Sequence, residues 1–96
     1  MEGNNVFKNK IDRLQLDINK SLMKDHAKAF ILNLTYSEEI MVTISCNGIV
    51  YNQSFSYECV KSISVEDMLS IVMREFRDSI LDYYIDYQYL SRRVDL

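Results

Sequence analysis

The sequence has no proline, no tryptophan and only two glycines, Gly3 and Gly48, among its 96 residues. Proline and glycine are the residues that most often interrupt helices and strands and build long loops. Their scarcity argues against a flexible linker and against an active site assembled from loops. With 48% hydrophobic residues, we expect a single domain over residues 1–96 that buries a modest core without metal or disulfide support.

Residues that carry chemistry are also few, because the chain has two cysteines, Cys46 and Cys59, and a single histidine, His26. No Cys-x-x-Cys spacing is present, so a zinc site is not expected. His26 lies in the polar connection 24–26, which favours a turn residue over a catalytic base. The sequence contains neither a glycine-rich phosphate loop nor a recognisable nucleophile beside a base. We therefore predict that the protein is not an enzyme and that it uses no metal and no cofactor.

Long hydrophobic runs are missing as well. No apolar stretch approaches the roughly 18 residues of a membrane-spanning helix, and no short positive segment leads into an apolar run. The two cysteines lie too far apart in the strand register described below to form a disulfide, and unpaired thiols are typical of a reducing compartment. We expect a soluble, cytoplasmic protein without a membrane partner.

Positive charge is scarce toward the C-terminus. The formal net charge is −3, and it is uneven: residues 1–30 carry six Lys or Arg against four acids, whereas residues 65–96 carry four against seven. Binding to a phosphate backbone depends on Lys and Arg. The sequence therefore does not predict direct nucleic-acid binding.

Two stretches show helical periodicity, one from Val6 to Asp25 and one from Ser64 to Arg93. The second begins with a Ser-x-x-Asp variant of the capping box, in which Ser64 caps the helix and Asp67 lies beside its positive start. Spacings of three and four residues keep the apolar side chains of each stretch on one face. These residues are Phe7, Ile11, Leu14, Ile18 and Leu22 in the first helix and Leu69, Val72, Phe76, Ile80, Tyr83, Tyr87 and Leu90 in the second.

Three stretches between the helices alternate like β-strands: Ala27 to Tyr36, Ile40 to Cys46, and Ile49 to Tyr57. Asn47-Gly48 favours a two-residue type I′ turn. That turn sets the register of the second and third strands, which pairs Cys46 with Ile49, Ile44 with Tyr51, Val42 with Gln53 and Ile40 with Phe55.

A three-residue loop at 37–39 is predicted between the first two strands. It pairs Tyr36 with Ile40, Leu34 with Val42 and Leu32 with Ile44, so that Phe30 and its alternate neighbours face the core. The predicted fold class is α+β in the order αβββα: a three-stranded antiparallel meander, order 1-2-3, packed on one face by two helices, of which the C-terminal one is long.

The third strand lies at an edge of this sheet, and residues 49–57 contain no lysine, proline or other guard against pairing with another strand. Tyr51, Gln53 and Phe55 mark this edge as a candidate for homodimer formation or for the addition of a partner strand. A solvated edge of good β-formers is the simpler alternative.

A row of carboxylates occupies one flank of the C-terminal helix. Like charges spaced at i,i+4 on a helix cost about 0.2–0.5 kcal/mol per pair, so local stability does not explain the row. We interpret this acidic flank as a candidate partner-binding surface, with a solvated helix flank as the alternative. Its members are Ile71, Glu75, Asp78, Asp82, Ile85, Asp86 and Tyr89.

The element order resembles the double-stranded-RNA-binding domain, but that family has a basic cluster at the start of its last helix, where this chain has Ser64-Val65-Glu66-Asp67. In size, element order and acidic helix, the chain also resembles small phage-encoded anti-CRISPR inhibitors. That resemblance implies an acidic domain that occupies the nucleic-acid groove of a nuclease. Our hypothesis is a non-enzymatic inhibitor or adaptor that binds a basic protein partner. The alternative is a homo-oligomeric assembly protein that uses the sheet edge and the Tyr-rich helix end.

Overall fold

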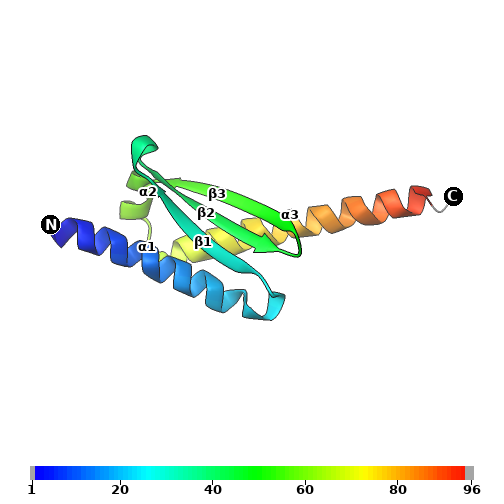
Figure 1. Ribbon diagram of the computed structural model, residues 1–96, viewed down its shortest axis with the longest axis horizontal. Helices are drawn as coiled ribbons and strands as arrows, with labels where there is room; N and C mark the ends of the chain where they lie inside the picture. The colour runs from blue at the N-terminus through cyan, green and yellow to red at the C-terminus, as the bar shows by residue number, and fades with distance from the viewer. Residues whose placement is uncertain (1, 95–96) are drawn as a thin grey trace.

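A three-stranded antiparallel sheet separates an N-terminal helix from two C-terminal helices in the chain order, which confirms the α+β prediction (Figure 1). The structure is a computed structural model that describes the backbone of residues 2–94 and the side chains of residues 6–80. The helices are α1 (Glu2–Ser21), α2 (Tyr57–Ser62) and α3 (Val65–Val94), and the strands are β1 (Lys28–Leu34), β2 (Glu39–Cys46) and β3 (Ile49–Ser56).

Helix α1 packs its predicted apolar face against the sheet. Leu14, Ile18 and Leu22 are fully buried, and Ile11 lies with them in the core. The helix ends at Ser21, earlier than predicted, and a short 3₁₀ turn, Met23–Asp25, leads to His26 in a left-handed conformation (φ 53°). His26 is thus an exposed turn residue, as the sequence indicates.

Helix α2 is an element that the periodicity did not reveal. It begins at Tyr57, inside the predicted third strand, because the Ser56 hydroxyl caps it by accepting a hydrogen bond from the Cys59 amide (3.2 Å). Only Val60 of this short helix is buried. The Tyr57 ring meets Phe7 of α1 edge to face, with centroids 4.8 Å apart, so α2 closes the end of the core between α1 and β3.

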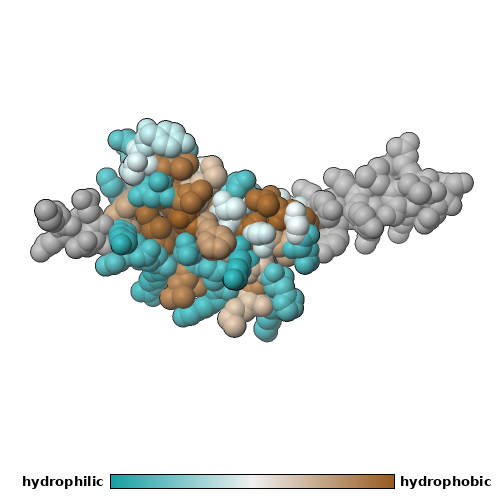
Figure 2. Space-filling model, in the orientation of Figure 1, coloured by the Kyte–Doolittle hydropathy of each residue, from teal (hydrophilic) through white to brown (hydrophobic). Residues whose placement is uncertain are grey.

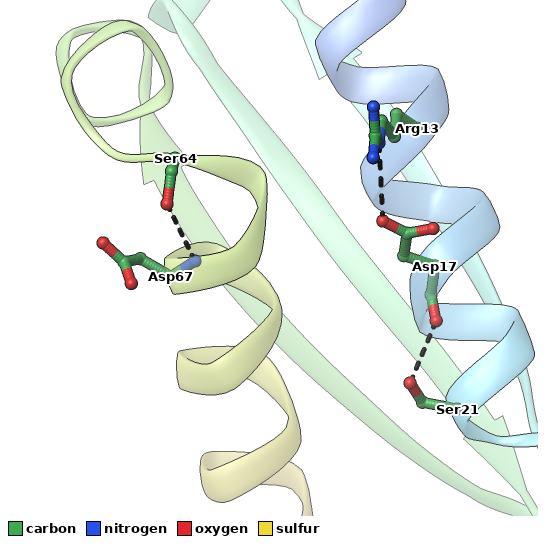
Figure 3. A network of polar contacts seen from close by, with 5 residues as sticks. All are labelled: Arg13, Asp17, Ser21, Ser64 and Asp67. Carbon is green, nitrogen blue, oxygen red and sulfur yellow. Dashed lines mark hydrogen bonds and ion pairs between the residues drawn. The ribbon is translucent and has the colours of Figure 1, made fainter.

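Helix α3 begins as predicted, since Ser64 Oγ accepts a hydrogen bond from the Asp67 amide (3.1 Å; Figure 3). Val72 and Phe76 are buried on the sheet side of the helix, and Met68 and Met73, which the predicted seam omits, are buried beside them. The seam residues Tyr83, Tyr87 and Leu90 lie outside the described side chains. The helix continues past the β2–β3 turn end of the sheet (Figure 1), as expected for a helix longer than the strands.

The register of β2 and β3 is the predicted one. Cys46 pairs with Ile49, Ile44 with Tyr51, Val42 with Gln53 and Ile40 with Phe55. Asn47 and Gly48 have φ values of 51° and 81°, which is the left-handed backbone that a type I′ turn requires at both central positions.

The predicted register of β1 is wrong. Asn33, Ile31 and Ala29 pair with Ile40, Val42 and Ile44, because residues 35–37 leave the strand as a 3₁₀ turn. The connection thus holds an even number of residues, 35–38, and the parity of β1 is reversed. Ala29 and Ile31 face the helices, whereas Phe30, Leu32 and Tyr36, which were predicted to face the core, are exposed.

Both faces of β1 carry apolar side chains, and the more hydrophobic set, Phe30, Leu32 and Leu34, is the one turned away from the helices. The choice is made by α1, whose Asn19 and Gln15 side chains hydrogen-bond the backbone of Ala29 and Ile31. These bonds require α1 to lie close to the strand, which the small side chain of Ala29 permits. The other face of the sheet, away from α1 and α3, is called the open face below.

Candidate partner-binding surface

The two edges of the sheet differ in how their backbone groups are satisfied. At β1, Asn19 Oδ1 accepts from the Ala29 amide (2.8 Å), Asn19 Nδ2 donates to the Ala29 carbonyl (3.1 Å), and Gln15 Oε1 accepts from the Ile31 amide (2.9 Å). Side chains of α1 therefore occupy positions that an added strand would use.

The β3 edge has no comparable cover from the described residues. In an antiparallel pair, successive residues point their backbone groups alternately toward and away from the neighbouring strand. The Tyr57 amide donates to the Glu38 carbonyl, just before β2 (2.9 Å). Every second residue before Tyr57 has the same orientation, so Tyr51, Gln53 and Phe55 direct their backbone groups to β2. The outward amides and carbonyls belong to Val50, Asn52 and Ser54, and no hydrogen bond reaches them from residues 6–80. We call these groups the β3 edge.

The three edge residues singled out from the sequence therefore contribute side chains rather than pairing groups. Phe55 is buried in the core. Tyr51 is partly buried against Phe76 of α3, with ring centroids 5.9 Å apart, and its hydroxyl donates to Gln53 Oε1 (2.6 Å). Tyr51 and Gln53 thus form the α3 side of the β3 edge.

The acidic flank of α3 adjoins this edge. Glu75 directly precedes Phe76, whose ring contacts Tyr51 of β3. Ile71, one turn earlier, packs partly against the core. Two surfaces that the sequence suggested separately, the β3 edge and the first turns of the acidic flank, are therefore continuous. We call this continuous region, comprising Val50, Tyr51, Asn52, Gln53, Ser54, Ile71 and Glu75, the β3–α3 surface.

The flank is not purely acidic in its described part. Arg74 Nη2 lies 3.7 Å from Glu75 Oε1, an exposed pair worth little to stability. Asp78 is exposed and lies at a shallow depression with Arg74 and Arg77, on the side of α3 that faces Ser21 of α1. Asp78 therefore borders the α1 side of α3. Glu75 precedes Phe76, the α3 residue that contacts Tyr51 of β3, and Ile71 lies one turn before Glu75. Asp82, Ile85, Asp86 and Tyr89 belong to α3, but their side chains lie outside the described residues.

The pKa of Tyr51 is raised above its ordinary value of 10.0, mainly because burial disfavours the phenolate and secondly because Glu75 repels it. The folded chain therefore holds this proton more tightly than the unfolded chain. The resulting contribution to stability is fully present below about pH 10, the unfolded pKa, and is lost as the pH rises through the higher folded pKa.

Replacing Glu75 with glutamine is expected to lower the pKa of Tyr51 while leaving it above 10.0, because burial, the larger cause, remains. NMR titration of chains with ¹³C-labelled tyrosine measures this pKa among the seven tyrosines. Asp78→Asn is the matched control and should not change it. An unchanged pKa in Glu75→Gln would show that Glu75 does not reach the β3 edge.

The open face is a second surface of unusual composition. Phe30, Leu32 and Val50 are 56%, 53% and 59% exposed, and no charged residue lies between them on the central strand, where they border Met41, Thr43 and Ser45. Hydrophobic side chains gather over the strands that face the viewer in Figure 2, which has the orientation of Figure 1. A correct sequence-based choice of the β1 face would have revealed this patch.

The remaining candidates offer no arrangement for catalysis among the described residues. Cys46 is buried and Cys59 is exposed, and both are free, as the strand register predicted. Residues 6–80 bring together no three His, Cys, Asp or Glu side chains able to hold a metal ion. No helix in the described part of the chain has the length and apolar character of a membrane span.

Comparison with protein-family models, with curated proteins and with solved structures finds no significant match to this chain.

Proposed function

We propose that the chain is a non-enzymatic protein-binding module that holds a basic protein partner at the β3–α3 surface. One observation carries the proposal: Tyr51 of β3, the strand with the uncovered edge, contacts Phe76 of α3, and the exposed carboxylate of Glu75 is the next residue along that helix. The edge offers main-chain hydrogen bonds, and the acidic flank offers opposite charge that steers a basic partner and fixes its orientation. In its sharpest form the module is an inhibitor of a nucleic-acid enzyme, whose basic groove takes carboxylates in place of phosphates.

This sharper form agrees with the resemblance to phage-encoded anti-CRISPR inhibitors. An enzyme that grips phosphates presents Lys and Arg, and the excess of acids over residues 65–96 opposes such a surface with complementary charge. The continuation of α3 past the sheet (Figure 1) extends the helix carrying Asp82 and Asp86 away from the core, toward a partner.

A homo-oligomer is the second candidate, because the exposed apolar open face offers a surface for a second copy. Three strands about 4.8 Å apart and about 26 Å long cover roughly 370 Å² per chain, or roughly 750 Å² for two chains. Stable interfaces bury about 1,200 Å² or more, so stacking of open faces is too small to hold a dimer alone. A light-scattering mass of one chain at high concentration would support the partner-binding proposal, and a mass of two chains would favour the oligomer.

The test is capture of a partner from extracts of cells that carry the sequence, with three forms of the chain immobilised in parallel. The first is the wild type, the second carries Glu75→Gln, Asp78→Asn and Asp82→Asn, and the third is a control that loses three acids elsewhere. The control substitutions are Asp12→Asn, Asp25→Asn and Glu58→Gln, all at exposed positions.

We expect a basic protein that binds the wild type and the control but binds the α3 variant about 10- to 100-fold more weakly, from three ion pairs of about 0.5–1 kcal/mol each. Its affinity, measured by calorimetry on the purified pair, should fall as salt is raised. Equal affinity of all three forms would contradict the proposal, and so would the absence of any captured protein.

A further inference from the structure

The two sheet edges differ in the hydrogen bonds made to their outward backbone groups, and this difference indicates where a partner binds. The side-chain amides of Asn19 and Gln15 hydrogen-bond the outward backbone groups of β1. Exposed strand edges without such bonds are templates for pairing with another strand. The β3 edge has no hydrogen bonds from the described residues, and β3 carries no charge and no proline over its eight residues. The protein thus guards one edge and leaves the other available.

The β3 edge is long enough for a specific strand. Its outward groups recur at every second residue, so Val50, Asn52 and Ser54 present three amides and three carbonyls over about 13 Å. Five residues of an added strand would satisfy all of them. None of the three side chains is large enough to screen the backbone, and the Asn52 side chain is already held on the open face, where its Oδ1 accepts from the Thr43 hydroxyl (2.8 Å).

We propose that the β3 edge takes an extended segment of a basic partner protein as a fourth strand, which is bonded through its main chain to Val50, Asn52 and Ser54 and places a lysine or arginine beside Glu75. This inference rests on the proposed function and states how the partner binds.

Side chains of the added strand would alternate between two different surroundings. On the α3 side they meet Tyr51, Gln53 and the half-exposed carboxylate of Glu75. Glu75 is the residue before Phe76, whose ring contacts Tyr51, so its carboxylate brings negative charge to this side of the edge. On the open-face side they meet Val50, Asn52 and Ser54, which are uncharged. The segment therefore carries cationic residues at alternate positions and uncharged residues between them.

Charge also separates this occupant from a second copy of the chain. Pairing with a second copy would put a two-fold axis between the two β3 strands, with the two Tyr51 side chains and the two acidic α3 flanks near that axis. Each chain has a net charge of −3. Like charges opposed across paired strands are destabilising. A segment that carries lysine would instead be attracted by the Glu75 carboxylate.

The test uses the ¹⁵N-labelled wild-type chain and two nine-residue peptide probes with blocked ends, one alternating threonine with lysine and the other alternating threonine with glutamate. With the lysine peptide, hydrogen exchange of the Val50, Asn52 and Ser54 amides should slow at least about tenfold, as expected for amides that enter a ladder. The Ala29 and Ile31 amides should keep their rates because Asn19 and Gln15 already hold them. The glutamate peptide should change none of these rates.

Two variants at one position separate main-chain pairing from side-chain contact. Ser54→Pro removes an outward amide that β2 does not use, and an edge strand tolerates proline at such a position. Ser54→Val keeps the amide. The lysine peptide should bind Ser54→Pro about three- to tenfold more weakly than Ser54→Val, the value of about one hydrogen bond.

Three results would overturn the inference. One is unchanged exchange at the β3 edge with the lysine peptide, and another is equal binding to the two Ser54 variants. The third is slowed exchange at the same amides on raising the chain concentration without peptide, which would assign the edge to a second copy. If capture of the partner depends on the α3 carboxylates but not on Ser54→Pro, the proposed function stands and this inference fails. If it depends on neither, the proposed function itself fails.

Discussion

An aspartate in place of Ala29 is expected to prevent folding, whereas an aspartate in place of the adjacent Phe30 is expected to leave the chain folded. Ala29 is 1% exposed beneath α1. A buried carboxylate without a partner costs several kcal/mol, against a total stability of about 5–14 kcal/mol for a chain of this length. Phe30 lies on the open face, so its replacement should cost only about 1–2 kcal/mol.

Circular dichroism during urea unfolding measures both variants against the wild type. The pair is a direct test of the β1 register, because the register expected from a three-residue loop reverses it. If Ala29→Asp folded and Phe30→Asp did not, Phe30 would belong to the core and the pairing of β1 with β2 would be wrong by an odd number of residues.

Leu14→Ala is expected to destabilise the chain by about 2–5 kcal/mol, because it removes a fully buried side chain and leaves a cavity between α1 and the sheet. The melting temperature should fall by roughly 10–30 °C for a domain of this size. Leu16→Ala is the matched control, since the same change is made two residues later on the solvent side of the same helix. Leu16 is 55% exposed, and its loss should cost about 0.5 kcal/mol or less.

Thermal and urea unfolding of the two leucine variants test the orientation of α1. Equal destabilisation by the two substitutions would contradict the packing of α1. It would also remove the basis for the contacts of Asn19 and Gln15 with β1, because those side chains reach the strand only when Leu14 and Ile18 face the core.

The parts of the fold that follow from the sequence are those with a single dominant signal. Asn47-Gly48 determines the β2–β3 register because few other residue pairs accept two successive left-handed conformations. The apolar period of three and four identifies α1 and α3, and Ser64 marks the start of α3. These elements are where periodicity, capping and turn chemistry agree.

The first strand shows why the remainder was not predictable. Phe30, Leu32 and Leu34 form a more hydrophobic alternate set than Ala29, Ile31 and Asn33, so hydrophobicity favours the wrong face. The correct face is selected by contacts with Gln15 and Asn19, which lie 16 and 10 residues away. Helix α2 was missed for a related reason: Tyr57 and its neighbours continue the pattern of a strand, and only the Ser56 cap signals the helix.

The candidate surface was partly predictable. Composition identifies the acidic flank and the unguarded strand. It does not reveal that Phe76, the neighbour of Glu75, contacts Tyr51, since this depends on how α3 crosses the sheet. The sequence also suggested Tyr51, Gln53 and Phe55 for the edge, whereas backbone parity assigns the outward groups to Val50, Asn52 and Ser54. Alternate residues of β3 direct their backbone groups away from β2. The predicted β2–β3 register is therefore enough to identify Val50, Asn52 and Ser54 as the outward residues.

Addition of the partner as a fourth strand on β3 is measured by hydrogen exchange of the chain, free and bound to its captured protein partner. Slowed exchange is expected at the Val50, Asn52 and Ser54 amides in the complex. The Ala29 and Ile31 amides should be unaffected. Protection confined to the open face around Phe30 and Leu32, with the β3 edge exchanging as in the free chain, would contradict it.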